Sequence, residues 1–208
     1  MKHLARVLLI LVAVTAVIGA VLAYTVIRRG LSTQVAPSAA EEALARAMRH
    51  LATPAAVRSR QNPVEPTEAV LEEGLEHFAD HCALCHANDG SGDTAIGRNL
   101  YPPAPDMRLA GTQNLSDGEL FSIIENGIRL TGMPAWGTGT TEGESATWGL
   151  VHFIRRLPDL TAEEITRMEG LNPKTPEQFR EEEEIRRFLA GEDLPSEGTE
   201  ATPRRAHH

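Results

Sequence analysis

The sequence predicts an all-α fold, on three observations. Apolar residues recur at three- and four-residue spacing in several segments, which places them on one face of a helix. A Ser or Thr followed three positions later by Glu marks a helix start at Ser38, Ser116 and Thr161. No stretch has sustained apolar and polar alternation, the pattern of half-buried strands.

The N-terminal segment is the most apolar part of the chain. Residues 4–27 contain few polar side chains: Arg6, Thr15, Tyr24 and Thr25. At about 1.5 Å per residue, a helix of this length spans a hydrocarbon core of about 30 Å. A cleaved signal peptide has a shorter apolar region, and Val21-Leu22-Ala23 is only a weak cleavage site. We therefore expect residues 1–29 to be a transmembrane signal anchor, with cleavage as the alternative.

Residues 30–66 are predicted to be a stalk or linker, because they contain four prolines and few aromatic residues. As a flexible coil this linker would span on the order of 30–35 Å. Within it, Ser38 and Glu41 form a possible capping box, and Leu44, Met48 and Leu51 share one helical face. Such a helix is either part of a plain stalk or a docking surface for the next domain or a partner.

Residues 67–158 contain the clearest helical signals. Thr67 is expected to cap a helix whose apolar stripe ends at Cys82, and residues 87–114 are predicted to be a loop rich in Gly, Pro, Asn and Asp. A second helix is expected from Ser116 to the Asn126-Gly127 stop. A third is expected to begin at Thr141 with Glu144 and to end before Pro158.

Two shorter helices are expected in residues 159–191. The first begins at the Thr161 and Glu164 capping box, and the second begins at Thr175-Pro176. The tail, residues 192–208, is polar without an apolar stripe and is predicted to be disordered. Its terminal His207 and His208 are expected to be solvent-exposed or the remnant of a tag, with weak metal binding as the alternative.

Composition limits the size of the core and the class of partner. The 208 residues suit one domain with appendages, and aromatic residues are only 4%. A small domain short of core residues usually needs a disulfide, metal or cofactor. The net charge of −9 argues against nucleic acid, which requires a clustered basic surface. The acidic run at residues 181–184 is interpreted as a solvated helix face paired with Arg186 and Arg187.

Cys82-Ala83-Leu84-Cys85-His86 matches the attachment motif of a c-type haem. Two thiols three residues apart on a helix end reach two vinyl groups on one porphyrin edge. The following imidazole then lies under the iron and ligates it. A zinc site would need two more ligands, and there is no other cysteine. A thioredoxin-like dithiol would need a βαβ setting, which the pattern does not predict.

The second axial ligand is predicted to be Met133. It lies in Gly132-Met133-Pro134, a stiff loop between two apolar helices that can reach the opposite haem face. Met107 is the runner-up and His152 the third candidate. The remaining internal methionines fit helix faces and are interpreted as core packing, as methionines commonly are: Met48 and Met168.

With these motifs, residues 67–158 resemble a small single-haem cytochrome c of the Met/His-ligated bacterial kind. The other matching features are Leu-Ser-Asp-Gly-Glu-Leu before a helix, Gly132-Met133-Pro134-Ala135-Trp136 and the helix through Trp148. The resemblance implies a small cytochrome c fold around one covalent haem c, with Phe78 and Trp148 where the first and last helices cross. It also implies a proline carbonyl that holds His86, with Pro102 or Pro103 as candidates. Residues 159–191 have no counterpart in the minimal family fold and are expected to be a helical extension.

The expected function is electron transfer without enzymatic activity, because His and Met in both axial positions leave no site for substrate. The partners would be membrane redox proteins acting as electron donor and acceptor. Covalent haem attachment in this family occurs outside the bacterial cytoplasm. The domain is therefore expected on the periplasmic side of the cytoplasmic membrane. The alternatives are a haem enzyme or gas sensor with a labile sixth ligand, and a fixed subunit with residues 38–52 and 159–191 as assembly surfaces.

Overall fold

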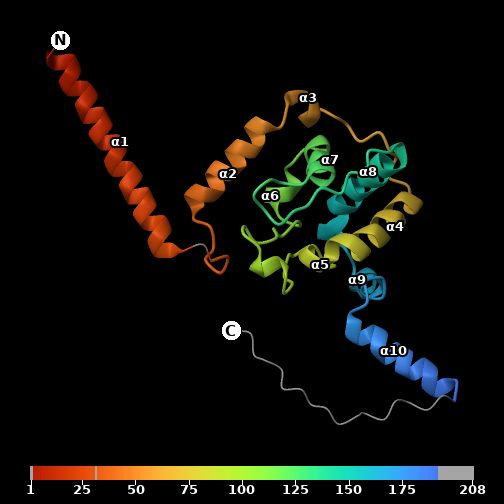
Figure 1. Ribbon diagram of the computed structural model, residues 1–208. Coiled ribbons are helices and arrows are strands. Elements are labelled where there is room, and N and C mark those ends of the chain that lie inside the picture. Colours follow the sequence, from red (N-terminus) through yellow and green to blue (C-terminus); the bar gives the residue numbers. More distant parts are fainter. Residues whose placement is uncertain (1, 31, 192–208) are drawn as a thin grey trace, which may run out of the picture. The chain divides into compact units, whose positions relative to one another are not determined.

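The chain folds into helices joined by loops (Figure 1). The computed structural model describes residues 2–30 and 32–191, and every regular element in these residues is helical, so the all-α prediction is confirmed. The chain divides into two compact units, residues 1–171 and 172–208. The predicted disordered tail, with His207 and His208, lies outside the described residues.

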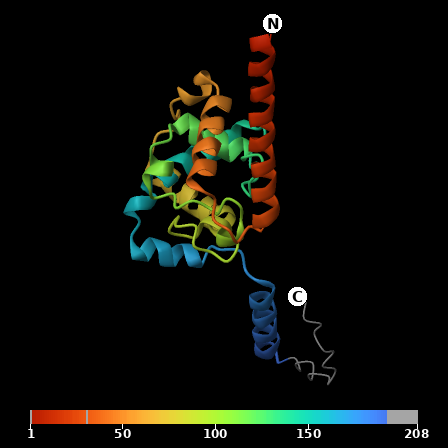
Figure 2. The ribbon, with the colours of Figure 1, turned by 90° about the vertical axis from the view of Figure 1, so that its left-hand side faces the viewer.

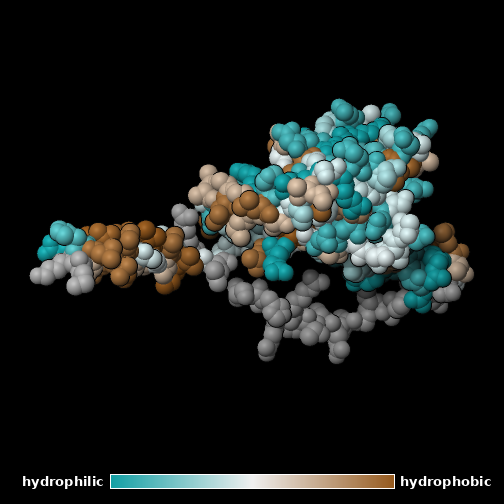
Figure 3. Space-filling view, turned by 90° about the horizontal axis from the view of Figure 1, so that it is seen from above, coloured by the Kyte–Doolittle hydropathy of each residue, from teal (hydrophilic) through white to brown (hydrophobic). Residues whose placement is uncertain are grey.

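The N-terminal helix α1 (Lys2–Arg29) is a single uninterrupted helix (Figure 2). Its apolar side chains are exposed and form a continuous hydrophobic surface in Figure 3. Within the described residues, His3–Arg28 is the one helix long and apolar enough to cross a membrane. Helix α1 therefore has the length and the exposed apolar surface of a membrane span.

Two helices follow in the predicted linker, α2 (Ala39–Ala52) and α3 (Ala55–Arg58). The Ser38 and Glu41 capping box is present at the start of α2. Residues 39–58 are largely helical, so the dimensions of a flexible coil do not describe this part of the linker.

The centre of the domain is the crossing of α4 (Glu68–His77) and α8 (Thr141–Arg156), which lie side by side in Figure 1. Their approach requires glycine at Gly74. A Cβ atom there would lie 3.0 Å from the Gly149 carbonyl oxygen and 3.0 Å from the Phe153 Cβ. Beyond the glycine, the rings of Phe78 and Phe153 pack with centroids 5.2 Å apart. Phe153, not Trp148 as predicted, is thus the aromatic partner of Phe78.

Trp148 lies on another side of α8, facing α7 (Asp117–Asn126). Its ring stacks on Phe121 of α7 with centroids 4.1 Å apart. Helix α7 has the predicted ends, a capping box of Ser116 with Glu119 and a glycine stop at Gly127. Helix α8 begins at Thr141 as predicted, but its cap is the preceding residue, Thr140, whose side chain accepts a hydrogen bond from the Gly143 amide.

The long segment between the haem motif and α7 is mostly loop, as predicted. It contains only a 3₁₀ turn at Gly97–Asn99 and the short α6 (Ala110–Gln113). After α8, the turn Leu157–Asp159 leads into α9 (Ala162–Glu169), whose Met168 is fully buried in the core. The second unit contains α10 (Pro176–Leu189), which begins at a capping box of Thr175 with Gln178.

Replacing Gly74 by Val should push α4 and α8 apart. The added carbons would meet backbone and a Cβ atom, neither of which can rotate away, so unfolding free energy should fall by about 1–3 kcal/mol. Denaturant unfolding of the holoprotein measures this. Gly111→Ala in α6 is the control, since a Cβ at Gly111 has nothing within 4 Å. Equal stability of the two variants would show that the crossing is not tightly packed.

Candidate functional site

The cysteine and histidine motif follows directly from α4. Residues Phe78–Cys82 form a π-helical turn, and α5 (Ala83–His86) continues it. In this turn the Ala83 amide donates to the Phe78 carbonyl, five residues back. Such turns are rare and frequent at functional sites. The wider turn changes the direction in which the Cys85 and His86 side chains leave the helix.

Cys82 and Cys85 are both free thiols and partly buried. Burial raises the pKa of Cys82 to about 12, with a smaller contribution from the charge of Cys85. Burial also raises the pKa of Cys85. A reactive redox dithiol has a lowered pKa instead, so the electrostatics differ from those of a thioredoxin-like motif. Across residues 2–30 and 32–191, no cluster of three or more His, Cys, Asp or Glu side chains is arranged to hold a metal ion.

The His86 imidazole has no fixed partner. Its Nδ1 atom is buried and makes no hydrogen bond within the described residues. Burial lowers the pKa of His86, and the carbonyl of Pro105 raises it by a smaller amount. This carbonyl therefore acts on the ring electrostatically, although Nδ1 makes no hydrogen bond within the described residues. The result favours a neutral imidazole, the form that ligates iron.

Pro105, and not Pro102 or Pro103, is the proline whose carbonyl acts on His86. The sequence does not distinguish the three, because the choice depends on how the loop folds back. The Gly92 amide donates to the His86 carbonyl at 2.8 Å, and the Met107 amide donates to the Gly90 carbonyl at 2.8 Å. These two bonds return residues 105–107 to the motif.

Arg108 holds the same loop together through ion pairs with two aspartates. Its guanidinium donates to both carboxylate oxygens of Asp106, at 2.9 and 2.7 Å, and to Asp89 at 2.8 Å. Asp89 is near the start of the loop and Asp106 near its end. One arginine thus ties the two ends of the loop together beside His86.

Met133 lies in a loop that is hydrogen-bonded to the C-terminal end of α7. The Met133 carbonyl accepts from the Ile128 amide at 3.1 Å, and the Trp136 amide donates to the Ile124 carbonyl at 3.0 Å. Gly127 makes this return possible. Its φ is +63°, and a Cβ there would lie 2.7 Å from the Met133 carbonyl oxygen. The loop is held by the protein's own backbone, with the Met133 side chain partly buried.

The Met133 loop meets the haem motif through Trp136. The Trp136 ring lies edge to face with that of His81, the residue before Cys82, with centroids 5.5 Å apart. The Met133 loop also approaches the long loop that follows the motif, because a Cβ at Gly132 would lie 2.6 Å from a methyl carbon of Leu100. Two segments forty-seven residues apart in sequence, at His86 and Met133, therefore bound the same region.

The other candidate ligands lie elsewhere. Met107 is buried in the core, with 7% of its surface exposed, and Met168 is fully buried. The His152 Nε2 atom lies 2.7 Å from the Val64 carbonyl oxygen, so that ring already has a partner. Met48 is exposed on α2, not packed in a core as the sequence suggested.

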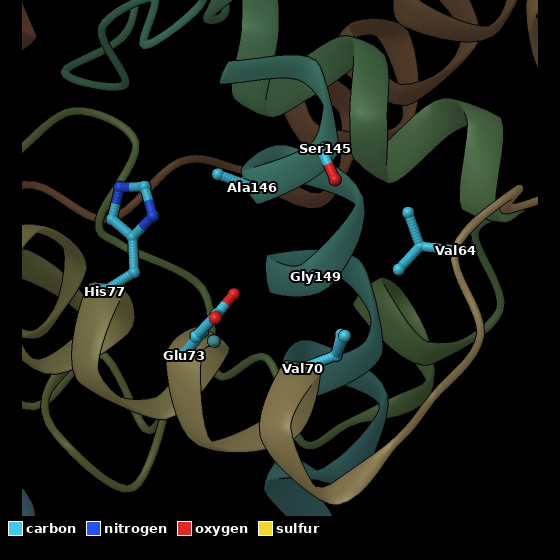
Figure 4. Close-up of a pocket in the computed structure, with 8 residues that line it drawn as sticks. Val64, Val70, Glu73, His77, Ser145, Ala146 and Gly149 are labelled. Carbon is cyan, nitrogen blue, oxygen red and sulfur yellow. The ribbon is translucent and has the colours of Figure 1, made fainter. Parts of the chain in front are cut away.

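A small pocket of about 50 Å³ lies beside the α4 and α8 crossing (Figure 4). Glu73 and His77 of α4 line it opposite Ser145 and Ala146 of α8. Sites for small organic molecules have volumes of about 300–1,000 Å³. This pocket has room for a few water molecules and is not a candidate substrate site.

Residues 69–154 match the family described as cytochrome c oxidase, cbb3-type, subunit III. The chain carries a c-type cytochrome domain. The match lies within the region expected from the sequence, residues 67–158, and it implies a covalently bound haem c and electron transfer. The described residues fit this group, because the motif offers two free thiols and a neutral imidazole whose buried nitrogen has no partner.

Replacing Arg108 by Gln should loosen the loop that carries Pro105. Since Arg108 holds the pKa of Asp106 below its usual range, the stabilisation is present above the ordinary carboxyl pKa of about 4 and is lost as pH falls through the lowered value. At pH 7 we expect a loss of about 1 kcal/mol in unfolding free energy, since the pair is partly exposed.

The difference between wild type and Arg108→Gln should shrink as pH falls below about 4. Denaturant unfolding at several pH values measures it. Arg98→Gln is the control, because the Arg98 and Asp93 pair is more exposed and should contribute little. A difference that does not vary with pH would contradict the ionic origin of the effect.

Proposed function

We propose that this protein is a membrane-tethered electron-transfer cytochrome whose haem is held by Cys82 and Cys85 and ligated by His86 and Met133. The contact between Trp136 and His81 carries the proposal, because it puts the Met133 loop beside the attachment motif. The fit of the thiols and the imidazole to haem c supports the first three residues. The Gly-Met-Pro loop and its attachment to α7 support the fourth.

Each residue then has a distinct role. Haem c supplies a one-electron iron couple. Cys82 and Cys85 hold the group to the chain through two thioether bonds. His86 presents Nε2 to the metal, and Pro105 is the acceptor available to orient the ring. Met133 would supply the second iron ligand, which would raise the reduction potential relative to two histidines and leave no site for a substrate.

The tether is proposed to be α1, with its N-terminus in the cytoplasm and the cytochrome domain on the periplasmic side. The length and exposed apolar surface of α1 support a span. Covalent haem attachment on the outer side, as in the family that the chain resembles, supports the orientation. Its partners would be membrane redox proteins, one donating and one accepting an electron. A tether raises the effective concentration at such partners without tight docking.

A second candidate is a fixed subunit of a larger membrane complex. The family description, which names an oxidase subunit, favours it. Extraction in mild detergent separates the two. Co-purification with a membrane oxidase in constant ratio would support the fixed subunit, whereas a free monomer that reduces an added oxidase would support the mobile carrier.

Replacing Met133 by Ala should remove the weak red-end absorption of the oxidised protein, which reports the bond between sulfur and iron. The reduction potential of the haem should fall by about 0.1 V, a fraction of the roughly 0.8 V range over which axial ligands set this potential. The opened site should also bind carbon monoxide or cyanide rapidly at neutral pH. Optical spectra and redox titration measure these changes.

Met107→Leu is the matched control, because it changes a buried methionine in the same domain without opening the predicted site. It should keep the absorption band. If the band survives in Met133→Ala and disappears in Met107→Leu, the ligand is Met107. Rapid, tight binding of carbon monoxide by the wild type would instead favour the gas sensor or enzyme.

Replacing both Cys82 and Cys85 by Ala should leave no covalent haem. Haem staining after denaturing electrophoresis should be lost in the double variant and retained in each single variant, since one thioether suffices to hold the group. Leu84→Ala is the control, because Leu84 lies between the cysteines and is 59% exposed. Covalent haem in the double variant would contradict the assignment.

A further inference from the structure

Helix α2 carries an apolar face that no other described part of the chain covers. Leu44, Met48 and Leu51 lie on one side of the helix, and they are 61%, 61% and 82% exposed. No residue of α2 is buried. The helix also carries charged residues, two acidic and two basic: Glu41, Glu42, Arg46 and Arg49. Such a helix has the pattern of one that lies in a membrane interface.

Helix α2 contacts the cytochrome domain near both of its ends. The Tyr101 hydroxyl lies 3.2 Å from a Glu41 carboxylate oxygen. At the other end, His50 Nδ1 lies 3.9 Å from a Glu119 carboxylate oxygen. Leu44, Met48 and Leu51 stay exposed while Glu41 and His50 make these contacts.

The segment after α3, residues 60–64, also packs against the cytochrome domain. The Arg60 guanidinium lies over the Phe121 ring at 4.4 Å and near the Trp148 ring at 5.1 Å. The Asn62 amide donates to the Trp148 carbonyl at 2.9 Å. With the His152 contact to Val64, these interactions make residues 60–64 part of the domain. The tether is then the segment between α1 and α2, in which the Gln34 side-chain amide donates to the Asn99 side-chain oxygen at 2.9 Å.

The length of that tether limits where α2 can lie. Helix α1 ends at Arg29 and α2 begins at Ala39. Nine intervening residues span at most about 30 Å when fully extended. An exposed apolar helix kept this close to the end of a membrane span has the lipid surface within reach at all times.

We propose that α2 lies in the interfacial region of the membrane that α1 spans, with Leu44, Met48 and Leu51 in the acyl boundary. This rests on the membrane-spanning role proposed for α1. The equal numbers of acidic and basic residues on α2 point to attraction through buried apolar area, so zwitterionic phosphatidylcholine, which has no net charge, is sufficient. Because α2 is attached to Tyr101 and Glu119, the domain is held with one face toward the membrane.

Cysteine accessibility in the full-length haem protein tests the proposal. Single variants Met48→Cys, Arg46→Cys and Leu11→Cys are placed in phosphatidylcholine nanodiscs with one protein per disc. The native cysteines are consumed by thioether bonds, so only the new thiol reacts with a water-soluble maleimide. In these discs Met48→Cys should react about tenfold more slowly than Arg46→Cys, because acyl chains exclude the water-soluble reagent.

The Leu11→Cys variant separates this inference from the proposed tether. A protected Leu11→Cys with Met48→Cys as reactive as Arg46→Cys overturns the interfacial helix and leaves the tether intact. A reactive Leu11→Cys overturns the tether, and with it the inference. Phosphatidylcholine with a photoreactive acyl chain should crosslink to residues 39–52 of the wild type. Protection of Met48→Cys without this crosslink means that protein covers the face, which also overturns the proposal.

Discussion

The absence of a side chain at Gly74 is the constraint on which the rest of the domain depends. It lets the α4 backbone lie against the α8 backbone, with the Gly149 carbonyl at the contact. The attachment motif begins five residues after α4 ends, so the crossing determines where Cys82 and His86 lie. The Met133 loop precedes α8 and is held by α7. The positions of both sides of the proposed haem site therefore depend on the packing of α4 against α8.

Helix ends were largely predictable because their signals are local. Ser116 with Glu119, and Gly127 after Asn126, give the start and stop of α7, and both are present in the structure. Because the predicted helices α7 and α8 flank the loop that contains Met133, the sequence also indicated that Met133 is available as a ligand and is not packed on a helix face. The start of α8 at Thr141 was predicted, but its cap was not, because Thr140 and Thr141 are both competent caps and only the backbone geometry chooses between them.

Contacts between elements were not predictable in the same way. Phe78 and Trp148 were paired by analogy, but the phase of α8 directs Trp148 toward Phe121 and Phe153 toward Phe78. The π-helical turn has no sequence signature that propensity can detect. Arg60 and Asn62 lie in a stretch without periodicity, which was interpreted as linker. Their attachment depends on two aromatic rings brought together by α7 and α8, and it exists only in the tertiary structure.

The way the Met133 loop is held bears on the choice between carrier and sensor. Its hydrogen bonds run to α7 and its packing to Leu100 and His81, so its position does not depend on a bond to iron. A loop with this independent support can keep a thioether at the same place in both oxidation states. A change of charge at the iron then requires little movement of the protein, which suits rapid electron exchange. A sensor needs the opposite property, a ligand whose departure moves a larger element. The attachment of the loop to α7 therefore favours an electron carrier.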